Sequence, residues 1–155
     1  MEDYKIVAEQ AFREAKMADH MAYVTSKIVN DKKIVISIVD HLSRAFMLSM
    51  KAYLIREKLR HNIKVVPEGD KEVTNFFFES YAQELKVEKS ILSIIYRLFN
   101  AVNAYNSRGI LLTRSDKYVF VSPEYELIDL NMNEIKEWLR DGLKFVNAIK
   151  ERLEQ

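Results

Sequence analysis

Three basic residues gather around a short segment that is rich in β-branched and aromatic residues: Arg108, Arg114 and Lys117. Guanidinium and ammonium groups donate charge-assisted hydrogen bonds to phosphate oxygens, and binding residues commonly lie on loops held by a rigid scaffold. We therefore expect this group to bind RNA, a nucleotide or a phosphate. The alternative is a solvated loop whose charges serve solubility. Neighbouring side chains that could stack on or hydrogen-bond a nucleotide are Tyr105, Asn106 and Tyr118.

The sequence predicts no metal site and no cofactor. Helical bundles hold paired metal ions through glutamate and histidine residues three positions apart, and the chain contains no such pair. Its three histidines, His20, His41 and His61, are preceded at that spacing by Met17, Ile38 and Lys58. The chain also lacks a glycine-rich phosphate loop and the glycine-flanked serine of the hydrolase nucleophile elbow.

Residues 1–62 have the spacing of a long helical hairpin. Small or apolar residues recur alternately four and three positions apart from Tyr4 to Val29, and a second such series runs from Val35 to Leu59. The second series is out of phase with the first, which predicts a turn at 30–32. Helices joined so closely lie antiparallel and in tight contact. The two series are Tyr4, Ala8, Ala11, Ala15, Ala18, Ala22, Thr25 and Val29, and Val35, Ile38, Leu42, Ala45, Ser49, Ala52, Arg56 and Leu59.

The middle of the chain, 71–109, is expected to form two further helices. They follow a loop at 62–70 that contains Pro67 and Gly69, and they are predicted at about 71–85 and about 87–106. Gly109 is then the expected left-handed residue that ends the second of them.

Residues 116–130 are expected to form a β-hairpin, because two runs of β-branched and aromatic residues flank Ser122, Pro123 and Glu124. Asn131 followed by Glu134 resembles a capping box and predicts a last helix over 131–155. The residues expected on the inner face of that helix are Ile135, Leu139, Gly142, Val146, Ile149 and Leu153. The predicted fold class is therefore mainly all-α. We expect a single domain over 1–155, an antiparallel up-and-down bundle of about five helices with a small β-hairpin before the last one.

Composition sets limits on location and on the kind of partner. Lys and Arg (24) nearly balance Asp and Glu (23), which argues against a protein that mainly coats DNA or an anionic membrane. The chain has no cysteine, no signal-peptide pattern and no apolar run of membrane-spanning length, so a cytoplasmic location and no membrane association are expected. Few cysteines and many Lys, Glu and Ile are also typical of a thermophile.

Segments 40–46 and 51–54 of the second predicted helix carry a resemblance to a known superfamily. They lie within residues 37–59, which resemble the HEPN superfamily, as does the long antiparallel pair followed by shorter helices. HEPN proteins are helical, and many associate with nucleotidyltransferases or act as ribonucleases. The resemblance therefore implies a helical binding module, with a nucleotidyltransferase as one implied partner and RNA cleavage as one implied activity.

The same resemblance implies a catalytic pair. In HEPN ribonucleases an arginine, followed after a short spacer by a histidine, supplies a cation and an imidazole near the scissile phosphate. Arg56 and His61 have four residues between them, and Arg13 and His20 have six. We take Arg56 and His61 as the better pair. The alternative is structural: the stem of Arg56 covers the core while its guanidinium reaches water, and His61 is a helix C-terminal cation.

Our preferred hypothesis is a non-catalytic, HEPN-like binding module. It would form a homodimer or bind a partner protein, because the packing pattern is abundant and no convergent catalytic set is visible. The alternative is a HEPN-type ribonuclease, or a protein that binds RNA or a nucleotide through the residues named above. Apolar residues that could remain for an interface once the core is filled are Met17, Met21, Met47 and Phe78.

Overall fold

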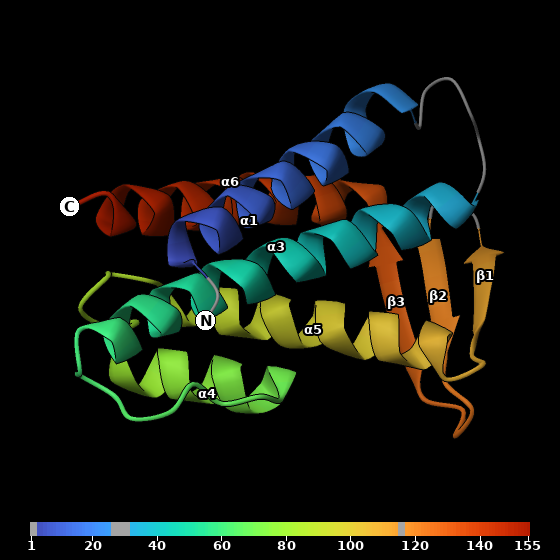
Figure 1. Ribbon diagram of the computed structural model, residues 1–155. Helices are drawn as coiled ribbons and strands as arrows, with labels where there is room; N and C mark the ends of the chain where they lie inside the picture. Colours follow the sequence, from blue (N-terminus) through green and yellow to red (C-terminus); the bar gives the residue numbers. More distant parts are fainter. Residues whose placement is uncertain (1–2, 26–31, 115–116) are drawn as a thin grey trace.

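The computed structural model describes residues 3–25, 32–114 and 117–155 (Figure 1). These residues form a mainly α-helical fold with a small antiparallel sheet before the last helix, which confirms the predicted fold class. In chain order the elements are α1 (Tyr4–His20), the π-helical turn η1 (Met21–Thr25), α3 (Lys32–Leu59), α4 (Asp70–Ser80), α5 (Lys89–Asn106), β1 (Ile110–Arg114), β2 (Lys117–Val121), β3 (Leu127–Asn131) and α6 (Met132–Leu153).

Alanines bring α1 close to two other helices. Ala11 and Ala15 pack with Ala45 of α3 and Val146 of α6, and a methyl group lets a helix axis approach its neighbour closely. Helices α1 and α3 run antiparallel, as predicted for the hairpin (Figure 1). The turn expected at 30–32 lies outside the described residues apart from its last residue, which begins α3. The buried alanines of α1 and η1 are Ala8, Ala11, Ala15, Ala18 and Ala22.

Helix α3 occupies the centre of the molecule and packs against α1, α4, α5 and α6. Its predicted apolar series is buried from Val35 to Arg56. Leu59, the last member of that series, is instead 52% exposed. Arg56, one turn earlier, already contacts the last turn of α6, so Leu59 lies where this pairing of helices ends.

The loop at 62–70 is present, whereas α4 is shorter than expected. It ends at Ser80, and residues 81–86 form turns that close on Lys86, whose φ of 58° is left-handed. The Val87 amide donates to the Ala82 carbonyl at 2.8 Å, which completes this turn. Tyr81 packs there on Tyr53 of α3 with ring centroids 5.0 Å apart, so tertiary contact takes the place of the last helical turn.

Arg108, and not Gly109, is the left-handed residue that follows α5. Its φ is 65°, and the expectation for Gly109 was wrong. Gly109 is needed for a different reason, because a Cβ atom there would lie 1.9 Å from the Ala104 carbonyl oxygen and 2.5 Å from that of Val121. The close approach of these two backbones turns the chain directly from α5 into a strand.

That strand, β1, was not predicted, and it makes the hairpin into a three-stranded antiparallel sheet in the order β1, β2, β3. Ile110 pairs with Val121, which pairs with Leu127 across the sheet. The side chain of Lys32, the first residue of α3, donates to the Leu111 carbonyl of β1 at 3.3 Å. Strand β1 is therefore tied to the start of the central helix.

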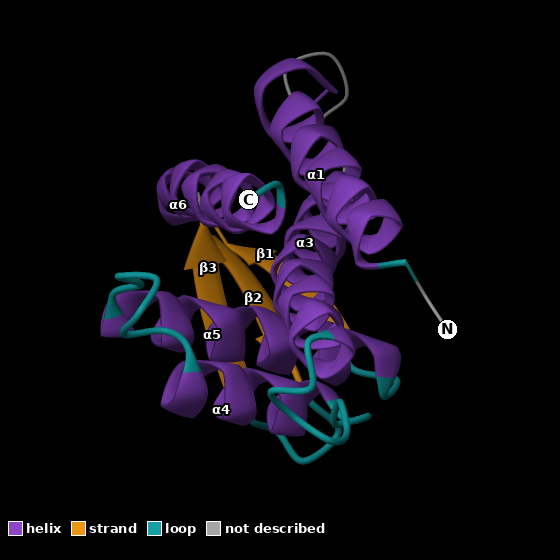
Figure 2. Ribbon diagram, turned by 60° about the vertical axis from the view of Figure 1, so that its left-hand side comes forward, coloured by secondary structure: helices purple, strands orange, loops and turns teal. Residues whose placement is uncertain are grey.

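One face of the sheet packs on the helices, where Leu111, Phe120 and Leu130 are buried. Figure 2 shows α3 and α5 in front of the strands, and α6 follows directly from β3. The predicted cap of α6 is confirmed, because the Glu134 amide donates to Asn131 Oδ1 at 2.8 Å. The inward residues of α6 are also buried as predicted, namely Ile135, Leu139, Gly142, Val146, Ile149 and Leu153.

Candidate interaction surface

Arg56, the first member of the implied catalytic pair, is buried. Its side chain is 4% exposed, and its Nη1 donates to the Arg152 carbonyl at 2.7 Å in the last turn of α6. Its guanidinium carbon lies 4.9 Å from the centroid of the Tyr53 ring, and Nη2 lies 3.6 Å from a Glu57 oxygen. The structural alternative was right to place the stem in the core, but the guanidinium does not reach water. Arg56 fastens the end of α3 to the end of α6.

His61, the second member, closes α3 through its backbone. Its φ is 62°, its amide donates to the Lys58 carbonyl at 3.0 Å, and the next amide, of Asn62, donates to Glu57 at 2.9 Å. This pair of bonds is a Schellman motif, in which a left-handed residue ends the helix. The His61 side chain is exposed. Burial of Arg56 and the capping role of His61 both weigh against the pair acting on RNA.

The second arginine and histidine pair lies on α1. Arg13 and His20 are both exposed, and His20 is the last residue of the helix. His20 lies where α1 passes into the π-helical turn η1, which is a structural position. His41 of α3 hydrogen-bonds through Nδ1 to the Glu14 carboxylate of α1. The pattern of histidines therefore serves helix ends and one link between helices.

The basic residues around the sheet do not all converge. Lys117 and Arg114 pair at one end of β1 and β2, while Arg108 precedes the opposite end of β1, on the order of 15 Å away for a strand of this length. Nothing is described of the Arg114 side chain. Lys117 lies 3.9 Å from an Asp129 oxygen, and Tyr118 is half-buried. The structure thus brings Arg114 and Lys117 together and leaves Arg108 apart.

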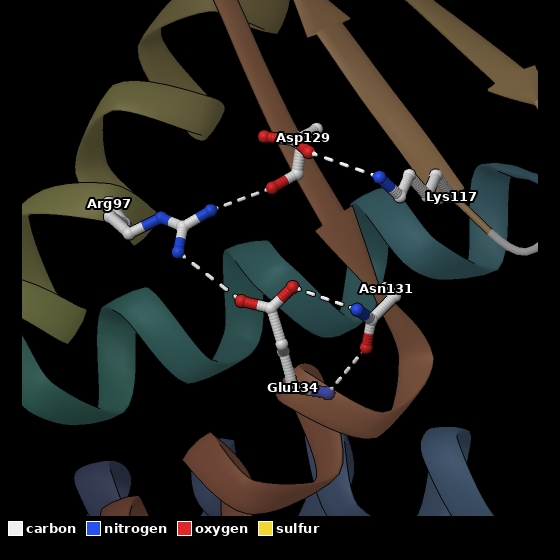
Figure 3. A network of polar contacts seen from close by, with 5 residues as sticks. All are labelled: Arg97, Lys117, Asp129, Asn131 and Glu134. Atoms are coloured by element: carbon white, nitrogen blue, oxygen red, sulfur yellow. Dashed lines mark hydrogen bonds and ion pairs between the residues drawn. The ribbon is translucent and has the colours of Figure 1, made fainter.

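A polar network that the sequence did not reveal fixes the sheet to the helices (Figure 3). Arg97 of α5 donates through Nη2 to the Asp129 carbonyl at 2.7 Å and through Nη1 to Glu134 at 3.2 Å. Its guanidinium carbon also lies 5.2 Å from the centroid of the Trp138 ring. Glu134 in turn accepts from Asn131 Nδ2 at 2.9 Å. One side chain of α5 thereby positions β3 and the start of α6.

The outer face of the sheet is open and apolar around Ile110, Leu112 and Leu127, while Lys117 and Asp129 make the other end of the same face polar. Ile110, Leu112 and Leu127 are 57%, 51% and 68% exposed, and the half-buried Val119 and Val121 lie between them on β2. The register places these side chains in adjacent rows, because alternate residues of neighbouring strands share a face. A continuous apolar patch of this kind is typical of an interaction site. We call these five residues the outer sheet face.

Tyr125 is a highly exposed aromatic residue in a strained backbone conformation. It lies in the turn between β2 and β3, where its amide donates to the Ser122 carbonyl at 2.9 Å. Its φ is 64°, which is unfavourable for a bulky side chain, and it is 85% exposed. The sequence reading placed Tyr125 in a strand, so its exposure was missed.

Three of the four apolar residues proposed from the sequence as an interface are partly buried against the core. Met17 of α1 is 47% exposed, whereas Met21, Met47 and Phe78 are partly buried against the core. The interface residues that sequence reasoning missed are those of β1, because that strand was not predicted. Residues 110–114 are three apolar residues followed by two polar ones, without the alternation that signals a half-buried strand.

The described residues offer neither a cluster of metal ligands nor a membrane-spanning helix. They contain no group of three or more His, Cys, Asp or Glu side chains placed to hold a metal ion. They also contain no helix that is both long and apolar enough to cross a membrane. No protein-family model, no curated protein and no solved structure matches this chain.

Two tyrosines near Arg56, Tyr53 and Tyr81, have raised pKa values. Burial raises the pKa of Tyr53 above its ordinary value of 10.0, and the charges of Glu57 and Glu84 raise it further, while Arg56 and Arg152 act in the opposite direction. The pKa of Tyr81, whose ring packs on Tyr53, is raised by burial and by the same two glutamates. Both phenols therefore resist ionisation in the folded chain.

We expect Arg56→Ala to destabilise the fold by about 3 kcal/mol or more, because it removes a buried ion pair and leaves Glu57 without its cation. His61→Gly is the matched variant at the other implied catalytic position. It should leave the free energy of unfolding unchanged or slightly raised, since glycine favours the left-handed conformation. Urea denaturation followed by circular dichroism measures both. Unchanged stability of Arg56→Ala would show that the guanidinium does not hold α3 to α6.

We expect the folded state to lose stability at alkaline pH through Tyr53 and Tyr81. The stabilising contribution of a raised pKa is complete below the unfolded value of about 10 and is lost as the pH rises through the folded value. The free energy of unfolding should therefore fall as the pH rises above about 10. A Tyr53→Phe, Tyr81→Phe double variant should lose less over the same range. Equal losses in the two proteins would contradict this origin.

Proposed function

We propose that this chain is a non-catalytic interaction module that pairs with a second copy of itself through the outer sheet face. The observation that supports this most directly is the exposure of Ile110, Leu112 and Leu127 side by side on one open sheet. A soluble monomer rarely leaves a contiguous apolar patch uncovered, and another sheet of the same twist is a natural cover for it.

Charge at the two ends of the strands favours a second copy as the occupant. Lys117 lies at the end where β1 meets β2, and Glu124 lies in the turn at the opposite end. In the proposed pair, a two-fold axis lies between the two stacked sheets and runs perpendicular to the strands. This axis places the Lys117 end of one sheet over the Glu124 end of the other, so Lys117 of each copy comes opposite Glu124 of its partner. The face is then complementary to itself in charge as well as apolar in its centre.

The size of the outer sheet face predicts a weak pair. Three strands of five residues cover about 14 by 17 Å, so two stacked sheets cover on the order of 500 Å² before their flanking turns are added, well below the roughly 1,600 Å² of a standard specific interface. Tyr125 adds a large exposed aromatic side chain in the turn at one end of these strands, and tyrosine is enriched among residues that dominate binding. We therefore expect a dissociation constant in the micromolar range.

The resemblance to the HEPN superfamily supports the same class of function and adds a nucleotidyltransferase as an alternative partner. The ribonuclease alternative has less support, because Arg56 is buried and His61 caps a helix. RNA or nucleotide binding would have to use Arg114 and Lys117, the two basic residues that share one end of the sheet. No observation favours it over pairing of two chains.

We expect the wild-type chain to show twice the monomer mass in light scattering at about 100 μM and to dissociate on dilution. Leu112→Lys places a charge in the centre of the outer sheet face and should leave only monomer. Met17→Lys is the matched control, because Met17 is similarly exposed but lies on α1. A wild-type chain that stays monomeric, or equal effects of the two variants, would rule out self-association through this face.

A charge exchange in the same assay tests the two-fold arrangement. Lys117→Glu and Glu124→Lys should each weaken the pair several-fold, because like charges then meet at both ends. The double variant should recover the wild-type affinity. Melting temperatures of all three variants separate this effect from damage to the Lys117 and Asp129 pair. Additive weakening in the double variant would contradict the exchange of ends.

We expect Tyr125→Gly to have opposite effects on folding and on pairing. Glycine relieves the left-handed strain, so the melting temperature of the monomer should rise by a few degrees. The dissociation constant should rise about tenfold, because the exposed ring is lost from the interface. Calorimetry and light scattering on the same preparation measure the two quantities. A stabilised variant with unchanged dissociation constant would remove Tyr125 from the interface.

A further inference from the structure

A small groove lies on the helical side of the sheet, away from the outer sheet face. It runs between the first half of α3 and the end of α5, and its volume is about 160 Å³. Its floor is apolar: the half-buried Ile36 of α3 and Val102 of α5 offer accessible surface, while Val39 and Phe120 are each only 1% exposed. A water takes up about 30 Å³ in the liquid, so this space is that of about five waters and suits a small organic molecule.

The rim of the groove is polar and carries both charges. Asp40 and Arg44, one turn apart on α3, form an ion pair with Oδ2 and Nη2 separated by 3.2 Å. The Asp40 side chain is 32% exposed and that of Arg44 is 58% exposed, so both remain accessible to a small molecule. Tyr105 and Asn106 of α5 complete the opposite side.

Each member of this ion pair keeps bonding capacity for a ligand. A guanidinium has five donors in a planar fork, of which the contact with Asp40 occupies few. A carboxylate has two oxygens, and Asp40 faces Arg44 with one of them. The rim can therefore accept an ammonium group at Asp40 and donate to a carboxylate at Arg44 within a few ångströms of each other.

We propose that the groove binds a free α-amino acid with an aliphatic side chain about the size of valine or leucine. Its ammonium group binds Asp40, its carboxylate binds Arg44, and its side chain lies against Ile36 and Val102 on the floor. The two charges of an α-amino acid sit on one carbon atom, which matches the short separation of Asp40 and Arg44. The small volume excludes larger side chains.

Other ligand classes match this groove less well. Asp40 would repel a phosphate or a simple carboxylate, and Arg44 would repel a metal ion or an amine. A nucleobase offers hydrogen-bonding edges for both residues, but it gains most from an aromatic face on which to stack. The floor offers aliphatic side chains and the buried ring of Phe120. A zwitterion with an apolar tail is the class that satisfies rim and floor together.

The experiment is a titration of the isotope-labelled chain with L-leucine, followed through its backbone amide resonances. We expect shifts at Asp40, Arg44 and Tyr105 with a dissociation constant of about 1 mM, as befits a small ligand in an open site. Isocaproate, which lacks the ammonium group, and isopentylamine, which lacks the carboxylate, should each bind at least tenfold more weakly. Both retain the branched apolar tail.

Substitutions at the rim of the groove test whether Asp40 and Arg44 themselves bind the ligand. Asp40→Asn and Arg44→Gln should each weaken leucine binding about tenfold, while Arg140→Gln, an exposed arginine of α6, should leave it unchanged. Melting temperatures identify any variant that has lost its fold. If a variant is lost in this way, the comparison of leucine with its two analogues on the wild-type chain still tests the proposal. Absence of shifts at about 20 mM leucine, equal binding of the analogues, or shifts at these residues with adenosine but not with leucine would overturn the proposal.

Discussion

Close approach of helix backbones around α3 is the constraint on which the rest of the molecule depends. Ala11 and Ala15 of α1 pack with Ala45 of α3 and Val146 of α6, so short side chains form the centre of this contact. This lets α3 run through the middle, with α1 and α6 on one side and α4 and α5 on the other. Larger residues at these positions would separate the helices and open the core that holds the sheet in place.

Features with a regular spacing could be predicted from the sequence. The alanine series, the buried face of α6 and the cap at Asn131 follow from periods and residue types that are local, and the structure confirms them. Strand β1 could not be predicted, because its five residues form a strand only through pairing with β2. The left-handed residue after α5 was assigned to Gly109, since sequence cannot show that backbone contact, rather than φ, requires the glycine.

Side-chain roles set by distant contacts were the least predictable part. Arg97 links α5 to β3 and α6 across residues more than thirty positions away, and nothing in its own neighbourhood marks it. Arg56 lay in the predicted apolar series of α3, which was a sign of its burial, but its partner Arg152 is at the end of the chain. The outer sheet face was missed for the same reason as β1, because a face exists only once the register is known.

The bond from Lys32 to the Leu111 carbonyl bears on how the chain behaves when it is concentrated. Strand β1 is an edge of the sheet, and an apolar edge offers free backbone groups to any other extended segment. A lysine ammonium on one of these carbonyls occupies an acceptor and places a charge where an incoming strand would have to lie. Growth of the sheet sideways, strand upon strand into a fibre, is thereby opposed at this edge, while its flat face stays available for a closed and finite contact.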